Sequence, residues 1–400
     1  MSTSDLLKRM AKKGYTTMDT ITTASESKPP LKAKIPILNL ALSGSFDGGL
    51  TVGTTIFAGP SSSFKTALML YFIKIFQTQY LDGVVFFQDT EGGTNYNMMK
   101  NFGVDMSRVF YAEPMHMHEL HHNIQKIVEE VKPTDNVMLC VDSIGSVATA
   151  SEIARASDDK ITTDVGNRAK EIKSMFRTIA PYVRQNNIYA LFLNHTYDTP
   201  SIYSERVMSG GSGPRFDAQN IIYLSKVVLP KELRRRDGDN RFKILTDKSR
   251  RIIDKSAFHI DVYQHSGIDP TSCLEDLAKN ITVEYEGKQT SILSHYHGQY
   301  WDYLSLNELT GEVVQSRITK SDMQTSEFWA KMLLNKLFIG GVEEKYVINI
   351  DNELSESGDD IYEKVDAIKD VGVKNEVDKK TVQKSPKSKS TKKDEETASE

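Results

Sequence analysis

The sequence predicts an α/β protein with a mostly parallel, twisted sheet, and three observations carry this prediction. Short, continuously apolar runs alternate with helical patterns along residues 31–270, which is typical of parallel strands covered on both faces. One run ends at a glycine that opens a phosphate-binding loop, and two later runs end in acidic residues. Ligands of open parallel sheets bind beyond the carboxyl ends of the strands, so these end positions predict one shared site.

Composition excludes several classes of protein. The 400 residues are 39% hydrophobic and 26% charged, which is ordinary for globular proteins. The net charge of −4 provides no global basic field, so any nucleic-acid site must be local. No signal peptide is visible, and no run approaches the roughly 18 apolar residues of a membrane helix. Cys140 lies in an apolar run, which favours a buried thiol. We expect a soluble cytoplasmic protein without membrane contact.

Residues 1–30 predict an arm and not a domain. They are rich in Ser, Thr and Lys and close with Pro29-Pro30. This pattern predicts a short helix, Ser4 to Lys13, followed by a linker. An apolar segment, Ile35 to Leu42, then leads through glycines to the strand that delivers the phosphate-binding loop.

The phosphate-binding loop follows from an apolar strand that ends at Gly59, with a Lys-Thr pair six and seven residues later. Backbone N–H groups of such a loop bind phosphate oxygens, Lys65 contacts the terminal phosphates, and Thr66 ligates magnesium. The next helix, Ala67 to Tyr80, points its N-terminus at the anion. Phe64 stands where the motif has a second glycine, so a serine-rich turn is the alternative interpretation. The predicted contacts are Gly59, Pro60, Ser61, Ser62, Ser63, Phe64, Lys65 and Thr66.

Two later strands end in acids. The run Val137 to Val141 precedes Asp142, which fits a carboxylate that holds magnesium. The run Val84 to Gln88 precedes Asp89-Thr90-Glu91, where a carboxylate could take a proton from an attacking water. Helix capping explains either acid alone. The ordered occurrence of both after the phosphate loop favours catalysis.

A zinc-protease pattern also occurs, because His118 to His122 reads H-E-x-x-H. The apolar stripe of the predicted helix lies opposite His118 and His122. No convincing third ligand follows in the sequence. We therefore interpret the histidines as a solvated helix face.

A long helix, Asp164 to Gln185, and a strand, Ile188 to Leu193, precede a long connection at 196–219. Its aromatics, arginines and glycines suit a single-strand nucleic-acid loop, because bases stack on rings and guanidinium groups hold phosphates. A mobile surface loop is the alternative. Strands Asn220 to Leu224, Phe242 to Asp247 and Ser256 to Val262 follow. The candidate nucleic-acid contacts are Tyr203, Arg206, Gly210, Gly211 and Arg215.

Residues 271–350 predict a small C-terminal lobe with helices Leu274 to Ala278 and Ser326 to Phe338. Residues 351–400 begin with an acidic stretch and continue as lysine-, serine- and glutamate-rich low complexity. Such a composition cannot bury enough apolar surface to fold, so we predict a disordered tail.

These segments, taken in order, resemble the RecA-type recombinases, and among them the bacteriophage UvsX branch, in which Phe also precedes the lysine. The likeness is strong over residues 31–270, weak to 350 and absent in the tail. It rests on Gly48-Gly49-Leu50 with Gly53, the loop Gly59 to Thr66, Asp89-Thr90-Glu91, Val141-Asp142-Ser143, Leu193-Asn194-His195 and Gly210-Gly211.

The resemblance implies a RecA-like P-loop ATPase core that uses ATP and Mg²⁺. It makes Glu91 the catalytic base and Asp142 a magnesium residue with Thr66. His195 stands where RecA has a glutamine that senses the terminal phosphate and signals to the DNA loop. The segments after Val147 and Thr196 take the positions of the two DNA-binding loops.

The resemblance also implies a function and partners. Lys248 and Arg250 match basic residues that reach the ATP of a neighbouring subunit, and the arm 1–30 would contact that subunit. The expected activity is ATP-dependent homologous recombination, in which a helical filament on single-stranded DNA pairs with duplex DNA and exchanges strands. A single-strand-binding protein and a loading mediator are the expected partners, in a host cytoplasm if the chain is phage-encoded. A ring-forming helicase or another DNA-dependent ATPase with this core is the alternative.

Overall fold

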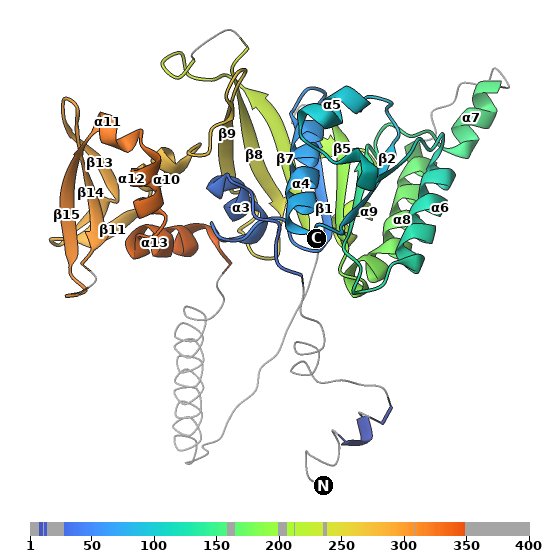
Figure 1. Ribbon diagram of the computed structural model, residues 1–400, viewed down its shortest axis with the longest axis horizontal. Coiled ribbons are helices and arrows are strands. Elements are labelled where there is room, and N and C mark those ends of the chain that lie inside the picture. Colours follow the sequence, from blue (N-terminus) through green and yellow to red (C-terminus); the bar gives the residue numbers. More distant parts are fainter. Residues whose placement is uncertain are drawn as a thin grey trace, which may run out of the picture. The chain divides into compact units, whose positions relative to one another are not determined.

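The computed structural model describes residues 8–10, 12–13, 28–157, 165–198, 206–211, 213–234, 238–307 and 309–348 (Figure 1). Residues up to Ile348 belong to one compact unit. Of the predicted helix Ser4 to Lys13, residues 8–10 are helical. Outside the described residues lie residues 1–7, 11 and 14–27 of the arm, Tyr203 and the tail 351–400.

A mostly parallel, twisted sheet forms the centre of the compact unit (Figure 1). Its strands are β1 Gly53–Gly59, β2 Val84–Asp89, β3 Val109–Ala112, β4 Val137–Asp142, β5 Tyr189–Asp198, β6 Arg206–Met208, β7 Asn220–Val227, β8 Asn240–Lys248, β9 Ala257–Tyr263 and β10 Gly267–Ile268. The order is β10-β9-β8-β7-β1-β5-β4-β2-β3, with β6 paired to β5. Strands β3, β2, β4, β5, β1 and β7 are parallel, whereas β8, β9 and β10 pair antiparallel. The predicted fold class is confirmed.

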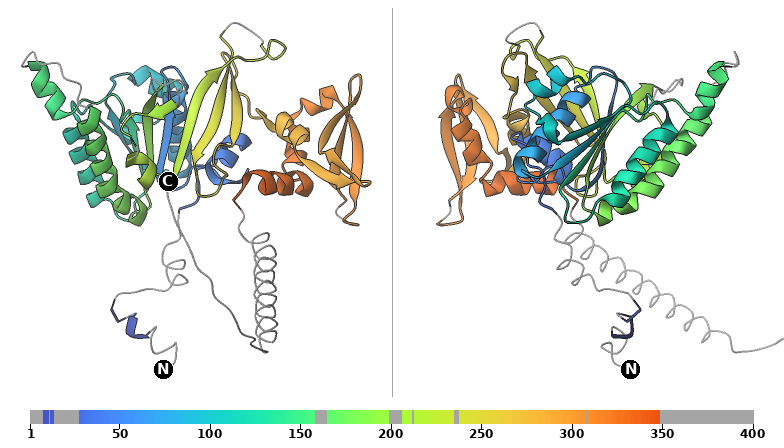
Figure 2. Two further views of the ribbon diagram at one scale, coloured as in Figure 1. Left: turned by 180° about the vertical axis from the view of Figure 1, so that it is seen from behind. Right: turned by 45° about the vertical axis from the view of Figure 1, so that its right-hand side comes forward.

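Helices cover both faces of this sheet (Figures 1 and 2). The helices of this part of the chain are α3 Pro36–Ser43, α4 Lys65–Gln79, α5 Tyr96–Asn101, α6 Met117–Glu130, α7 Ala150–Ser157, α8 Val165–Gln185 and α9 Gly213–Asp217, with a 3₁₀ turn at Met106–Arg108. Of these, α7 projects away from the sheet (Figure 1). Successive side chains of β1 alternate between two buried clusters: Phe57 joins the cluster of α4, and Ile56 joins that of α6 and α8. This alternation explains why the continuously apolar runs form the central strands.

The H-E-x-x-H segment forms the start of α6. The His116 ring accepts a hydrogen bond from the Glu119 backbone N–H at 3.1 Å and so caps the helix. The Glu119 carboxylate accepts one from the Met115 backbone N–H at 2.8 Å. His118 and His122 are exposed, as predicted for a solvated face. The glutamate therefore completes a helix cap.

The connection 196–219 is more ordered than predicted. Strand β5 continues to Asp198 and pairs with β6, with Asp198 opposite Arg206. A short helix, α9, follows. The interpretation of residues 196–219 as one loop is wrong for these parts. Backbone pairing with β6 extends strand β5 beyond the apolar run that predicted it.

The C-terminal lobe, 271–348, contains strands that the sequence did not predict. They are β11 Thr282–Tyr285, β12 Lys288–Ser291, β13 Leu293–His297, β14 Tyr300–Leu306 and β15 Val313–Thr319. The helices are α10 Leu274–Asn280, α11 Lys320–Met323, α12 Ser326–Met332 and α13 Lys336–Tyr346. The prediction of one helix from Ser326 to Phe338 is wrong, because the Asn335 side chain caps a new helix by accepting from Leu337 N–H at 3.1 Å.

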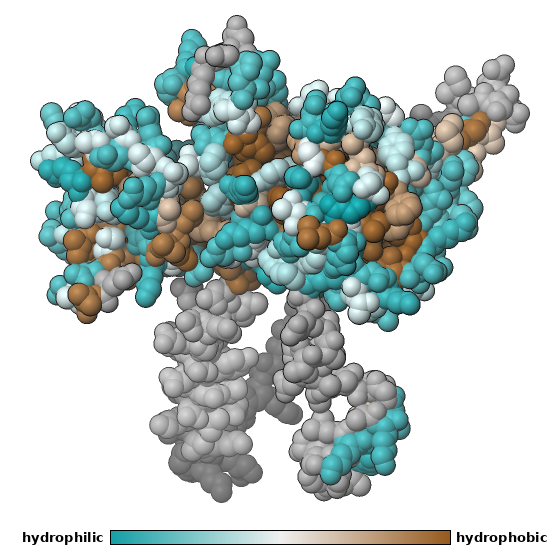
Figure 3. All heavy atoms as spheres, viewed as in Figure 1, coloured by the Kyte–Doolittle hydropathy of each residue, from teal (hydrophilic) through white to brown (hydrophobic). Residues whose placement is uncertain are grey.

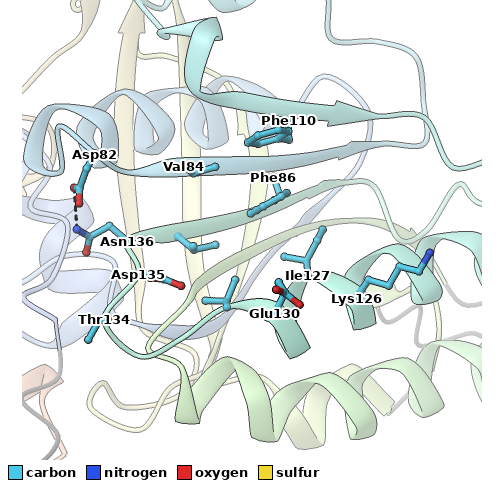
Figure 4. A pocket seen from close by; sticks show the side chains of 12 residues that line it. Asp82, Val84, Phe86, Phe110, Lys126, Ile127, Glu130, Thr134, Asp135 and Asn136 are labelled. Carbon is cyan, nitrogen blue, oxygen red and sulfur yellow. Dashed lines mark hydrogen bonds between the residues drawn. The ribbon is translucent and has the colours of Figure 1, made fainter.

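An apolar groove of about 570 Å³ lies beside the edge strand β3. Its apolar walls are Phe86, Phe110, Ile127 and Val131, and Figure 4 shows the first three around it. We call it the edge groove. Phe110 is 61% exposed and stacks on Phe86 with ring centroids 5.3 Å apart. Hydrophobic residues gather on this side of the surface in Figure 3.

Among the described residues, no helix combines the length and apolar character that a membrane crossing requires.

Candidate active site

The phosphate-binding loop connects β1 to α4. A Cβ atom at Gly59 would lie 2.2 Å from the Leu224 carbonyl oxygen, so only glycine fits there. Phe64 has φ 73°, in the left-handed region that favours glycine. Its ring stacks on Phe242 of β8, with centroids 4.9 Å apart. Such a ring pair contributes about 0.5–1.5 kcal/mol, which offsets much of the roughly 1–2 kcal/mol of left-handed strain. An aromatic side chain can therefore replace the glycine of this motif.

Lys65 lies inside the loop and is 6% exposed. Its Nζ atom donates to the carbonyl oxygens of Gly59 at 3.0 Å and Pro60 at 2.8 Å. Burial lowers the pKa of Lys65, and the charges of Glu91 and Asp142 oppose this shift. The loop thus holds a cation among oxygen acceptors, and phosphate oxygens of a ligand would replace these acceptors.

Thr66 and Asp142 form the candidate magnesium site. The Thr66 hydroxyl donates to Asp142 Oδ2 at 2.7 Å. Burial raises the pKa of Asp142 to about 6, and the Thr66 hydrogen bond opposes the shift. Magnesium prefers oxygen ligands, and a divalent cation would compensate the charge of this buried carboxylate. The donor set therefore fits Mg²⁺.

Glu91 follows β2 and accepts three hydrogen bonds on one oxygen. The donors to Oε1 are Ser143 Oγ at 2.5 Å, Ser146 Oγ at 2.9 Å and His195 Nε2 at 2.6 Å. These bonds, that of His195 first, lower the pKa of Glu91 to about 2 against the effect of burial. His195 reaches this point because β5 pairs with β1 and places it opposite Gly59. The sequence predicted Glu91 and His195, but it did not predict the two serines.

Asp89 has a structural role. Its Oδ1 accepts from the backbone N–H groups of Glu91 at 2.9 Å and Gly92 at 2.8 Å. Its Oδ2 accepts from Thr94 N–H and from the Tyr111 hydroxyl. The helix-capping interpretation is wrong for Asp89, because the next helix, α5, is capped by Asn95. The hydrogen bonds of Asp89 instead hold the turn that carries Glu91.

The candidate DNA segment begins directly after His195. The Ser209 N–H donates to the His195 carbonyl oxygen at 2.9 Å, across the β5–β6 hairpin. Gly210 and Gly211 have φ values of 89° and 65°. A Cβ atom on Gly210 would lie 2.7 Å from the Ile172 side chain, so this glycine allows close packing on α8. The backbone of Arg206 lies in β6, and its side chain is outside the described part of the chain.

Lys248 does not reach the phosphate loop of its own chain. Strand β7 runs parallel to β1 with Asn220 opposite Thr55, and Lys248 pairs with Ile221 at the start of β7. Because Ile221 lies opposite Ile56, Lys248 stands level with the middle of β1 and two strands away from it. Three residues along β1 and two strand spacings place its backbone roughly 14 Å from that of Gly59.

Arg215 contacts Lys248, and Arg250 follows Lys248 just beyond the end of β8. The Arg215 guanidinium donates to Asp247 Oδ2 at 2.8 Å, and Lys248 Nζ donates to the carbonyl oxygens of Arg215 and Phe216. Arg250 is exposed. The structure thus brings Gly59 to Thr66, Glu91, Asp142 and His195 together and keeps these three cations apart from them. The ion pair of Arg215 gives no support to its assignment as a DNA contact.

Comparison with known proteins agrees with this geometry. Residues 31–261 match the RecA N-terminal domain. The "Recombination and repair protein" of Enterobacteria phage T4 is 31% identical over 365 residues, 88% of this chain and 89% of that protein. Protein RecA of Mycoplasma pneumoniae is 25% identical over 175 residues, 43% of this chain and 49% of that protein. Protein RecA of Campylobacter jejuni subsp. jejuni is 27% identical over 213 residues, 51% and 58% respectively. The chain belongs to the RecA family.

Proposed function

We propose that this chain is an ATP-dependent recombinase that forms helical filaments on single-stranded DNA and catalyses homologous pairing and strand exchange with duplex DNA. Family membership and the name of the phage T4 relative support a role in DNA recombination and repair. The observation that carries the proposal is the contact of Glu91 with His195 at 2.6 Å. This contact joins the candidate catalytic base to the residue that directly precedes the candidate DNA segment. We expect the protein to act in the cytoplasm, that of a host cell if it is phage-encoded.

ATP hydrolysis would use the residues that meet at the carboxyl ends of the central strands. The backbone of the loop Gly59 to Thr66 and the Lys65 ammonium would bind the phosphates. Thr66 and Asp142 would hold Mg²⁺, which neutralises phosphate charge when bound. Glu91 would take a proton from the attacking water.

DNA contact would use the segment at the end of β5. We propose Tyr203, Arg206, Gly210 and Gly211 as DNA contacts, and Arg215 would have to leave Asp247 to join them. His195 would report the terminal phosphate to this segment. ATP then acts as a switch, because a ligand that binds one arrangement of a mobile segment better than another shifts the population towards it.

The nucleotide site would be shared between subunits. The backbone of Lys248 stands roughly 14 Å from that of Gly59 by strand register, and its ammonium donates to the carbonyl oxygens of Arg215 and Phe216 and not to the phosphate loop. A head-to-tail assembly joins two different surfaces of each subunit. It can bring Lys248 and Arg250 to a neighbour's nucleotide, where they would stabilise charge on the transferred phosphoryl group.

The arm 1–30 would join subunits by entering the edge groove of another copy. Strand β3 is the last strand of the sheet in the described part of the chain, and exposed sheet edges readily accept another chain. Three acids, Asp82, Glu130 and Asp135, line the groove with one lysine, Lys126, whereas the arm carries the basic cluster Lys8, Arg9, Lys12 and Lys13. This charge complementarity favours the basic arm as the occupant over an acidic segment.

The test measures ATP hydrolysis with and without single-stranded DNA, together with exchange between a circular single strand and a homologous linear duplex. We expect hydrolysis to depend on single-stranded DNA and exchange to require homology. Directional unwinding of a duplex without exchange would overturn the proposal in favour of a ring-forming helicase.

A further inference from the structure

The Glu91 carboxylate accepts more hydrogen bonds on one oxygen than the role of a catalytic base requires. Its Oε1 atom accepts from Ser143, Ser146 and His195 at distances of 2.9 Å or less. A carboxylate oxygen has about two lone-pair sites. Three donors therefore saturate Oε1, so a water proton can reach only Oε2, and they stabilise the charged form, which weakens the group as a base.

The three donors differ in how firmly they are fixed. Ser143 belongs to the base of the site, because its N–H donates to Thr90 Oγ1 at 3.0 Å and its carbonyl oxygen accepts from that hydroxyl at 2.6 Å. Thr90 is the neighbour of Glu91 in the chain. Ser143 therefore moves with the catalytic segment.

Ser146 and His195 instead begin the two segments that were predicted to bind DNA. Ser146 lies just before α7, and the Thr149 backbone N–H there donates to Glu152 at 2.7 Å. His195 precedes the β5–β6 hairpin. The Glu91 carboxylate thus accepts a hydrogen bond from a residue just before each of the two candidate DNA segments.

Asn194 couples the starts of these two segments. Its Nδ2 donates to the Ser209 carbonyl oxygen at 2.8 Å, on the hairpin side. Its Oδ1 is buried and accepts no hydrogen bond from the described residues. A Cβ atom at Gly145 would lie 2.7 Å from this Oδ1 and 3.1 Å from the His195 nitrogen. The turn that carries Ser146 therefore packs directly on the strand that carries His195, so displacement of one segment disturbs the other.

We infer that Ser146 is a positioning residue that, with His195, holds Glu91 in a restrained arrangement until DNA on the two segments draws these donors away. This latch rests on the proposed function, because it assigns DNA to the two segments and proton transfer to Glu91. It goes further in naming Ser146 as the residue that suppresses hydrolysis without DNA.

The test compares Ser146→Ala with Ser146→Thr, which keeps the hydroxyl. Steady-state hydrolysis is measured for the full chain with and without an oligothymidylate, and kcat and KM for ATP are separated. We expect Ser146→Ala to raise the DNA-independent kcat about tenfold, the effect of one charge-assisted hydrogen bond. The KM and the DNA-stimulated kcat should stay at wild-type values, and Ser146→Thr should restore the low DNA-independent rate.

Ser107→Ala is the matched control, because Ser107 also donates to a carboxylate, Asp105, at 2.6 Å and lies outside this site. It should match wild type throughout. If the alanine variant at position 146 fails to fold, Ser146→Cys provides the same comparison with a weak donor.

The outcomes separate the latch from the proposed function. A wild-type rate that does not respond to DNA overturns both. DNA-stimulated wild-type hydrolysis, combined with an unchanged or lowered DNA-independent kcat in Ser146→Ala, overturns the latch alone. A raised rate that Ser146→Thr does not restore also overturns it, because a structural effect of the turn would then be the cause.

Discussion

At the carboxyl ends of the parallel strands the charged side chains contact one another, whereas the cations near the start of β7 contact other groups. Thr66 bonds Asp142, and Glu91 bonds His195. Near the start of β7, Lys248 bonds two backbone carbonyls and Arg250 is exposed. One chain assembles the first set by sheet pairing alone. Under the proposed function, the second set would find its phosphate partner in another subunit.

The largest expected effect is at the carboxyl ends of the parallel strands. Lys65→Ala removes the buried ammonium that would offset phosphate charge, so we expect hydrolysis to fall by about 10²–10³-fold or more. ATP binding should weaken as well. Nucleotide titration and a hydrolysis assay check both, and near-normal turnover would exclude Lys65 from the phosphate site.

Glu91→Gln should separate binding from chemistry. The amide keeps the size of the side chain but lacks basicity, so we expect turnover to fall by about 10²–10⁴-fold. ATP and DNA binding should persist, and filaments should be long-lived. Glu327→Gln is the control, because Glu327 pairs with Lys331 in the C-terminal lobe. Wild-type turnover of Glu91→Gln would remove Glu91 from the role of base.

A substitution in the edge groove tests filament assembly separately from nucleotide binding. Phe110→Arg places a charge in the apolar wall, so we expect filament formation to require about tenfold more protein, the effect of roughly 1.4 kcal/mol at the contact. Leu309→Arg, at a 97% exposed position of the lobe, is the control. Light scattering or electron microscopy provides the measurement. Unchanged assembly would mean that the arm occupies the groove of its own chain or does not enter it.

The smallest expected effect compares two arginines. Arg206→Ala should reduce the salt dependence of single-strand binding by about 0.7 in log–log slope, the value for one lost phosphate contact. Arg215→Ala should change the slope less, because Arg215 pairs with Asp247. Fluorescence anisotropy across a salt series measures both. Equal slopes for both variants and wild type would move the DNA site elsewhere.

The sequence predicted the central strands well, because each is a continuous apolar run bounded by turn residues. It also predicted the shared edge of the strand ends, which topology requires once the strands are parallel. The roles of Lys65, Glu91, Asp142 and His195 remain predictions. Their proximity is a finding.

Other features could not be predicted by periodicity. Strands β11 and β12 have only four residues each, and although Val283 and Tyr285 of β11 alternate with polar residues and pack on the core, so short a run is a weak signal. The turn Glu286-Gly287, with φ values of 51° and 72°, marks their hairpin. Ser146 is an ordinary loop serine in the sequence. Its bond to Glu91 depends on how closely Gly145 packs on β5. Such contacts follow from tertiary packing, which local pattern does not encode.

The central claim is that the active site is divided between subunits, and mixing of variants tests it most directly. Lys65→Ala and the double variant Lys248→Ala/Arg250→Ala should each be nearly inactive alone. Random head-to-tail assembly of equal amounts would pair an intact loop with intact cations at roughly a quarter of the interfaces. We predict that DNA-stimulated hydrolysis partly returns in the mixture. Two results together would contradict the account. Filaments shown to contain both variants would fail to recover hydrolysis, and in mixtures of wild type with the double variant the activity would follow only the wild-type fraction.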